Sequence, residues 1–283
     1  MEGLYKISGI RRQVYFNHKK RLEKVSYIEM RTLETARQVR LRHPSIGARP
    51  LYYMLQPQMG INKFEKLISD SGLGIGTKSK WIKTTDSNHP YRKYSNLTHG
   101  ITLNNTDCLW ATDITYWQGK DLVYYLTFIM DVYSRRIIGH SACNNMYAVS
   151  TLKVLESAFK LRKQSHFQHL IHHSDKGSQY CSTTYTNRLK MANISISMAK
   201  TSLENPYAER INGIIKNDYL LHFNTGSYAK LSRSLDEAVW LYNNERPHSE
   251  LGYMTPLEYE TQVKRQKSGE RYKMTLYDFN KDK

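Results

Sequence analysis

The chain of 283 residues has few of the features that mark secreted or membrane proteins. Its three cysteines, Cys108, Cys143 and Cys181, are far apart and odd in number, and no Cys-x-x-Cys pair occurs. This pattern argues against a disulfide framework and against a zinc finger. The longest apolar run, 122–130, contains two tyrosines and a threonine and is too short to span a membrane. No apolar leader is visible near the N-terminus, so we expect a cytoplasmic protein with no membrane partner.

Acidic residues are also scarce, with 25 Asp and Glu against 42 Lys and Arg, a formal net charge of +17. The excess is concentrated near the N-terminus, where residues 1–100 hold 19 Lys and Arg against 7 Asp and Glu. An ordinary solvated surface is one explanation. An imbalance of this size favours binding to a polyanion, and nucleic acid is the expected partner.

The N-terminal third predicts small helical modules. Residues 1–25 resemble part of a helix-turn-helix, with a short basic helix expected over 8–21. Residues 26–75 predict three helices, over 27–42, 49–55 and 62–71, which form a helix-turn-helix-like DNA-binding module or a bundle that only packs on the next domain. Residues 76–106 lack periodicity and predict a linker. The candidate DNA-binding residues of this region are all basic: Arg11, Arg12, Lys19, Lys20, Arg49 and Lys63.

From residue 107 onward the pattern is that of an α/β domain. Strands are expected over 109–117, 122–131, 136–143, 169–173 and 194–198, and helices over 149–162, 183–191, 206–220 and 232–243. This order predicts a mixed five-stranded sheet flanked by helices, in a core over 107–261. Residues 262–283 are a basic, polar tail for which the pattern indicates no fold.

Three carboxylates occupy positions at which they could bind a metal ion. Asp113 lies between apolar residues of a strand, Asp175 ends a buried-type strand, and Glu209 lies on a helix that begins near Pro206. A buried carboxylate is costly unless it is paired or binds a metal, and Mg²⁺ prefers such hard oxygen ligands. Spacing alone does not set them apart from the other acidic residues. Asp131 also ends a strand, and we interpret it as a turn residue.

Four sequence blocks resemble the OrfB-type transposases of bacterial insertion sequences, within the retroviral integrase superfamily. The blocks are Trp110–Tyr116, His173–Tyr180, Glu204–Arg210 and Tyr242–His248. The resemblance implies an RNase H-like fold and a D-D-E site formed by Asp113, Asp175 and Glu209, holding two Mg²⁺ ions with Mn²⁺ tolerated. It also implies strand cleavage by water, strand transfer by a 3′-hydroxyl, and a homo-oligomer acting on double-stranded transposon ends and target DNA. The expected location is the bacterial nucleoid, with possible fusion to, or partnership with, an upstream helix-turn-helix protein.

The third block departs from the family in its spacing. Only 33 residues separate Asp175 from Glu209, fewer than is usual, and the shortening falls in a predicted loop at 199–203. Glu204 lies closer to Asp175, but Glu204 and Asn205 match the acidic-Asn pair that precedes the family's catalytic Glu, so Glu209 is retained.

Three residues beyond the carboxylates are candidates for the DNA-binding surface. Lys216 lies about two helical turns after Glu209 and, at the family's basic position, is expected to contact a DNA phosphate. Arg246 and His248 either contact DNA or brace the catalytic helix. Two rival functions remain open: a nuclease of the same fold without strand transfer, and a non-catalytic DNA-binding protein derived from a transposase.

Overall fold

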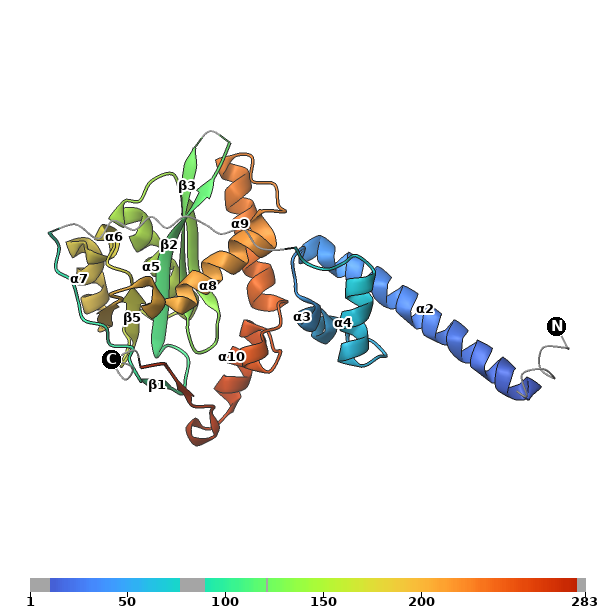
Figure 1. The fold of residues 1–283 in the computed structure, drawn as a ribbon. Helices are drawn as coiled ribbons and strands as arrows, with labels where there is room; N and C mark the ends of the chain where they lie inside the picture. The colour runs from blue at the N-terminus through green and yellow to red at the C-terminus, as the bar shows by residue number, and fades with distance from the viewer. Residues whose placement is uncertain (1–10, 77–89, 121, 279–283) are drawn as a thin grey trace. The chain divides into compact units, whose positions relative to one another are not determined.

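The computed structural model describes residues 11–76, 90–120 and 122–278, and the chain divides into two compact units, Met1–Gly76 and Thr77–Lys283 (Figure 1). In the first unit, α2 (Arg12–Arg42) is followed by α3 (Ala48–Leu55) and α4 (Ile61–Asp70). The two helices expected over 8–21 and 27–42 are therefore one continuous helix, because no Gly or Pro interrupts the intervening sequence. The start of the first expected helix lies outside the described residues.

A small apolar core holds the first unit together. The C-terminal half of α2 contributes Ala36, which is fully buried with Ile46, Leu51 and Phe64 from the following segments. α2 ends at Arg42, before His43 and Pro44, where the sequence predicts a stop. The N-terminal half of α2 contributes nothing to this core, and its residues 12–24 are exposed.

The second unit contains the predicted mixed sheet of five strands, in the order β4-β3-β2-β5-β6. The central strand β2 (Leu109–Gln118) pairs antiparallel with β3 (Val123–Asp131) and parallel with β5 (Ile171–Ser174). β4 (Ile137–Cys143) borders β3, and β6 (Ser195–Met198) pairs parallel with β5. The predicted α/β fold with a five-stranded mixed sheet is confirmed.

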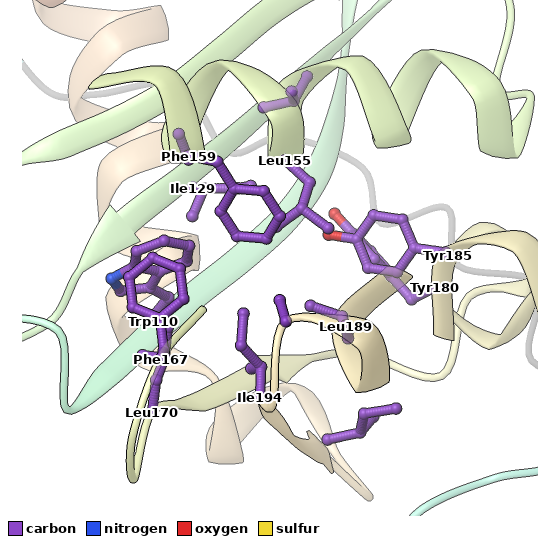
Figure 2. Packing of buried hydrophobic residues seen from close by; sticks show 14 of the residues in the cluster. Trp110, Ile129, Leu155, Phe159, Phe167, Leu170, Tyr180, Tyr185, Leu189 and Ile194 are labelled. Carbon is purple, nitrogen blue, oxygen red and sulfur yellow. The ribbon is translucent and has the colours of Figure 1, made fainter. Parts of the chain in front are cut away.

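One face of the sheet is covered by α5 (Ala148–Arg162), the short α6 (Ser178–Cys181) and α7 (Thr183–Met191). The cluster beneath them is strongly aromatic, with Trp110 beside Phe167 at one end and Tyr180 beside Tyr185 at the other (Figure 2). Successive side chains of a strand point to opposite faces, so Trp110 and Thr112 face this cluster while Ala111 and Asp113 face the other side.

The opposite face packs against α8 (Pro206–Ile214), the π-helix η2 (Ile215–Leu220) and α9 (Tyr228–Asn244). α10 (Pro256–Arg265) follows and begins with a capping box in which Thr255 and Glu258 bond each other's backbone. Asp113 thus lies on the face of β2 that α8 covers.

The described parts of the expected linker and tail, residues 90–106 and 262–278, both contribute to the second unit, whereas residues 77–89 and 279–283 lie outside the described residues. β1 (Thr102–Leu103) pairs antiparallel with β7 (Met274–Thr275), and Leu103 is buried with Val263 and Leu276. The sequence did not predict this pairing, because two-residue strands carry no periodicity. Within the described residues, no helix is long and apolar enough to cross a membrane.

A buried ionic network ties the end of β3 to α5 and α10. Asp131 is fully buried and accepts hydrogen bonds from the Ser134 backbone N–H at 2.9 Å and from Arg162 Nη2 at 3.0 Å. The bond to Ser134 confirms Asp131 as a turn residue. Arg162 also donates to Glu260, whose second oxygen accepts from Arg136 at 2.6 Å. Because Asp131 and Glu260 are buried and each binds Arg162, the network links β3, α5 and α10.

Candidate active site

The register of β2 and β5 brings the first two candidate carboxylates to the same level of the sheet. The strands run parallel, and Ala111 is paired with His173. Asp113 and Asp175 each follow that pair by two residues, with Asp175 just beyond the end of β5, so both extend toward the same face and the same edge. Both are partly buried.

The electrostatics of Tyr180 support this placement. Its phenol is buried against the sheet, where its hydroxyl lies 3.0 Å from Thr112 Oγ1. Burial is the largest cause that raises the pKa of Tyr180, and the negative charges of Asp113 and Asp175 raise it further. The charges of both carboxylates therefore raise the pKa of the same buried phenol, that of Tyr180.

Two hydrogen bonds join α8 to β2, one from a residue before Glu209 and one from a residue after it. Asn205, at the N-cap, donates from Nδ2 to the carbonyl oxygen of Thr112 at 2.9 Å. Two turns later, Asn212 Nδ2 donates to Asp113 Oδ2 at 2.8 Å. Glu209 comes four residues after Asn205 and three before Asn212, so it lies near the same stripe of the helix. The sequence reasoning missed Asn212, whose spacing from Glu209 was the available signal.

In this conformation the carboxylate of Glu209 does not form a metal-binding cluster with those of Asp113 and Asp175. Glu209 is exposed, and the described residues contain no group of three His, Cys, Asp or Glu side chains placed to hold a metal ion. The donor chemistry nevertheless fits a hard divalent cation, because Asp113 and Asp175 each follow the Ala111–His173 pair by two residues and Glu209 lies one helical turn from the residue that binds Asp113.

Glu204, the rival for the third position, has other partners. Its carboxylate accepts from Asn96 Nδ2 at 2.7 Å and from the backbone N–H of Lys200 at 2.8 Å. These contacts brace the loop before α8, in which the shortening relative to the family lies. Although burial acts to raise the pKa of Glu204, these hydrogen bonds hold it below its usual value.

Lys216 lies on the π-helix η2 and faces the sheet. Its Nζ donates to Thr115 Oγ1 at 2.8 Å and lies 5.1 Å from the centre of the Tyr116 ring, and the residue is only 2% exposed. Burial lowers the pKa of Lys216 to about 8, and Asp113 opposes this shift. π-helical turns are rare and concentrate at functional sites. Lys216 is thus a cation placed beside the Asp113 strand, and its contact with DNA stays a prediction.

Arg246 and His248 lie in the segment after α9. Arg246 pairs with the buried carboxylate of Asp218, on η2, at 2.9 Å. His248 packs edge-on against Tyr242 at 4.8 Å between ring centres, and burial, followed by Arg246, lowers its pKa to about 3. Arg246 thus contacts η2 and His248 contacts α9, and the choice between a bracing role and a DNA contact stays a prediction.

The histidines before Asp175 have packing partners. His172 accepts or donates a hydrogen bond with the Tyr185 hydroxyl at 2.9 Å, and His173 bonds Ser197 Oγ at 2.8 Å through Nδ1. Burial lowers the pKa of His172 to about 3 and that of His173 to about 4, so both are neutral at pH 7.

In the first unit, the predicted DNA-binding residues are surface residues of helices or lie next to one. Arg11, Arg12, Lys19 and Lys20 are exposed at and after the start of α2. Arg49 on α3 pairs with Glu65 at 2.8 Å, and Lys63 on α4 pairs with Glu29 at 2.8 Å. Arg49 and Lys63 are 60% and 51% exposed, so these ion pairs are weak and exchangeable.

Comparison with known proteins points to one family. Two family models described as integrase core domains match residues 105–202 and 191–256. The transposase for insertion sequence element IS629 of Shigella sonnei is 34% identical over 200 residues, which cover 69% of this chain and 66% of that protein. A putative transposase for insertion sequence element IS986/IS6110 of Mycobacterium tuberculosis is 30% identical over 214 residues, covering 69% and 73%.

The solved structures support the same fold. A cryo-EM structure of the simian T-cell lymphotropic virus intasome, in complex with the PP2A regulatory subunit B56 gamma, matches with a TM-score of 0.50 at 15% identity. The match covers 76% of this chain and 70% of that one. At this identity the likeness concerns the fold alone.

Proposed function

Because this chain belongs to the insertion-sequence transposases that contain an integrase core domain, we propose that it cuts the ends of such an element and joins them to target DNA. The superfamily consists of polynucleotidyl transferases, and the reaction is phosphodiester hydrolysis followed by transesterification. The observation that supports the proposal is the parallel pairing of Ala111 in β2 with His173 in β5, two residues before Asp113 and Asp175, while α8, which bears Glu209, binds Asp113 through Asn212.

Asp113, Asp175 and Glu209 are proposed to hold the divalent metal, with two Mg²⁺ ions as the expected complement and Mn²⁺ as a substitute. Bound there, the metal would lower the pKa of the attacking oxygen and stabilise the charge on the leaving oxygen. Asn212 fixes one oxygen of Asp113 by a 2.8 Å hydrogen bond and so orients the carboxylate. Lys216 holds the following residues of β2 through Thr115.

The basic N-terminal unit is proposed to bind double-stranded DNA at the element ends. The exposed Arg12, Lys19 and Lys20 give α2 a charged surface for phosphate contacts. Processing two ends requires more than one active site, so we propose a homo-oligomer on DNA. A partnership with an upstream helix-turn-helix protein would add a second DNA contact.

A joining assay separates this function from its two rivals. Labelled duplexes carrying the terminal sequence of the element, a supercoiled target plasmid and Mg²⁺ are incubated with the full chain. We expect cleavage at the terminal phosphodiester and labelled plasmid as the joined product. Cleavage without joined product would indicate the nuclease, and DNA binding without cleavage would indicate the non-catalytic protein.

Replacing Asn212 with alanine is expected to raise the Mg²⁺ concentration for half-maximal cleavage about 10- to 100-fold, since residues that orient metal ligands have effects of this size. The reason is the lost hydrogen bond to Asp113 Oδ2. The matched control is Asn144→Ala, because Asn144 is exposed and lies between β4 and α5. An unchanged Mg²⁺ dependence in a folded Asn212→Ala protein would argue against the positioning role.

A further inference from the structure

The segment 90–99, expected to be part of a linker, packs along one side of the sheet. The outermost strand on that side is β6, and the N–H of its last residue, Met198, donates to the Ser95 carbonyl oxygen at 3.3 Å. The Leu97 N–H donates to Ser197 Oγ at 2.8 Å. The segment is therefore held to the outermost strand, part of whose exposed backbone it covers.

The direction of this segment brings its first residues to the candidate active site. Ser95 lies at Met198, and Leu97 lies at the residue before it in β6, so the segment runs opposite to the strand. The residues before Ser95 therefore extend beyond the carboxyl end of β6. Met198 is paired with Ser174, the last residue of β5, and Asp175 follows it. The start of the segment and Asp175 thus lie at the same end of these parallel strands.

Arg92 is held at this end of the sheet by an aromatic ring. Its guanidinium carbon lies 5.1 Å from the centre of the Tyr94 ring, and Tyr94 is partly buried against the cluster beneath α5, α6 and α7. A cation over the face of such a ring is attracted to it, which restricts the side chain. Arg92 is nevertheless exposed, so its charge is accessible to a partner.

Two lysines lie near Asp175. Cys181 Sγ is 3.6 Å from the Sδ atom of Met198, at the end of β6. Burial is the largest cause that raises the pKa of this thiol to about 11, the charge of Asp175 raises it further, and Lys93 and Lys176 lower it. Because such interactions weaken with distance, Lys93, Lys176 and Asp175 lie around one thiol at this end of the sheet.

Lys200 adds a further cation at the end of the outermost strand. The Ala199 N–H donates to the Ser174 carbonyl oxygen at 2.8 Å, so the chain stays beside β5 for one residue beyond β6. Lys200 comes next and is exposed. Glu204 offsets part of its charge, since the Glu204 carboxylate accepts from the Lys200 N–H. The basic rim is the surface formed by Arg92, Lys93, Lys176 and Lys200.

We propose that the basic rim binds the phosphate backbone of duplex DNA on the β6 side of the phosphodiester held at Asp113 and Asp175. The inference rests on the proposed function and adds to it a binding surface to which a segment ahead of the integrase core domain contributes two cations. The carboxylates repel a DNA phosphate, and fixed cations beside them offset this repulsion. Contacts to phosphates position the duplex and carry no base specificity.

Replacing single phosphates by neutral methylphosphonates tests the contact position by position. Duplexes of the terminal sequence carry one methylphosphonate each, at successive phosphates on both sides of the cleaved bond, and the Kd of the full chain is measured without Mg²⁺. At the phosphate that Lys93 contacts, the wild type is expected to lose about eightfold in affinity at about 0.1 M salt, because one contact contributes a salt exponent of about 0.9. Lys93→Gln is expected to lose about twofold or less there, since the contact is already absent.

A second rim variant and a control show whether the effect belongs to this surface. Lys200→Gln is expected to lose its sensitivity at a different phosphate, and each of the two variants lowers the salt exponent of binding by about 0.9. The matched control is Lys190→Gln, since Lys190 is exposed on α7, which ends shortly before the start of β6. Lys190 is thus near the opposite end of that strand, and its variant is expected to keep the wild-type pattern.

The phosphate backbone that the rim contacts belongs either to the element ends or to the target, and a second series separates the two. In this series the methylphosphonates are placed in a target duplex, and the rate of joining is measured with Mg²⁺. Loss of sensitivity by Lys93→Gln in the first series assigns the rim to the element ends, and loss in the second series assigns it to target DNA. Either result supports the proposal.

The proposal is overturned if Lys93→Gln and Lys200→Gln both show the wild-type pattern at every phosphate in both series. Both side chains are exposed, so the variants are expected to fold, and their urea midpoints are recorded. Cleavage and joining by the wild type, together with unchanged variants, would reject the basic rim alone. Absence of wild-type cleavage would instead reject the proposed function.

Discussion

Asp175→Asn is expected to reduce DNA cleavage and joining by about 10³-fold or more, because loss of a metal-binding carboxylate removes several kcal/mol of transition-state stabilisation. Asparagine has nearly the same shape and retains an oxygen to accept the 2.9 Å hydrogen bond from the Gly177 N–H. The loop after β5 should therefore keep its conformation. The substitution removes the negative charge of residue 175, which lies at the level of Asp113 in the candidate site.

The measurement is the initial rate of terminal cleavage in Mg²⁺, with end-DNA affinity and the urea midpoint recorded for the same samples. The control is Asp236→Asn, whose carboxylate is 67% exposed and pairs with His140 of the edge strand β4. Cleavage at the wild-type rate by Asp175→Asn would contradict the metal-binding role. A shifted urea midpoint would show that the loss came from folding.

Arg162→Met is expected to lower the free energy of unfolding by about 3–5 kcal/mol, the range found when one partner of a buried ion pair is removed. Arg162 contacts Asp107, Asp131 and Glu260 at 2.8–3.0 Å, and its side chain is 7% exposed. Its removal leaves two buried carboxylates, Asp131 and Glu260, with Arg136 as the remaining cation of the network.

The loss should depend on pH. In the wild type, burial is the main cause that raises the pKa of Asp131 to about 7, and Arg162 opposes the rise. A folded-state pKa above the unfolded one means that the contribution to stability is fully present below about pH 4 and is lost as the pH rises through about 7. Without Arg162 this dependence steepens, so the variant is expected to lose more stability at pH 8 than at pH 5.

Urea unfolding at several pH values checks this expectation, since the midpoint reports stability when the slope is unchanged. The matched control is Arg188→Met, because Arg188 pairs with Glu156 at a site where the side chains are 23% and 48% exposed. An exposed pair of this kind contributes about 1 kcal/mol or less. Equal losses in the two variants would show that burial of the Arg162 network adds no stability.

The local pattern of apolar and polar residues was sufficient to predict most helices and strands, because each has a strong periodicity. The strand at 109–117 and the helix at 183–191 match β2 and α7 closely, since alternation and capping act over a few neighbouring residues. The continuous α2 was missed because a helix does not require an apolar stripe along its whole length when it contains no breaker. The β1–β7 pairing joins segments about 170 residues apart, which no local window detects.

The identity of the candidate carboxylates was determined by the sequence, because the four blocks fix residue types at defined separations. Their mutual placement was decided by the tertiary structure. Strand register, which depends on long-range pairing, brings Asp113 level with Asp175. Burial, which depends on neighbours from other elements, places Lys216 against the sheet, where its Nζ donates to Thr115 Oγ1.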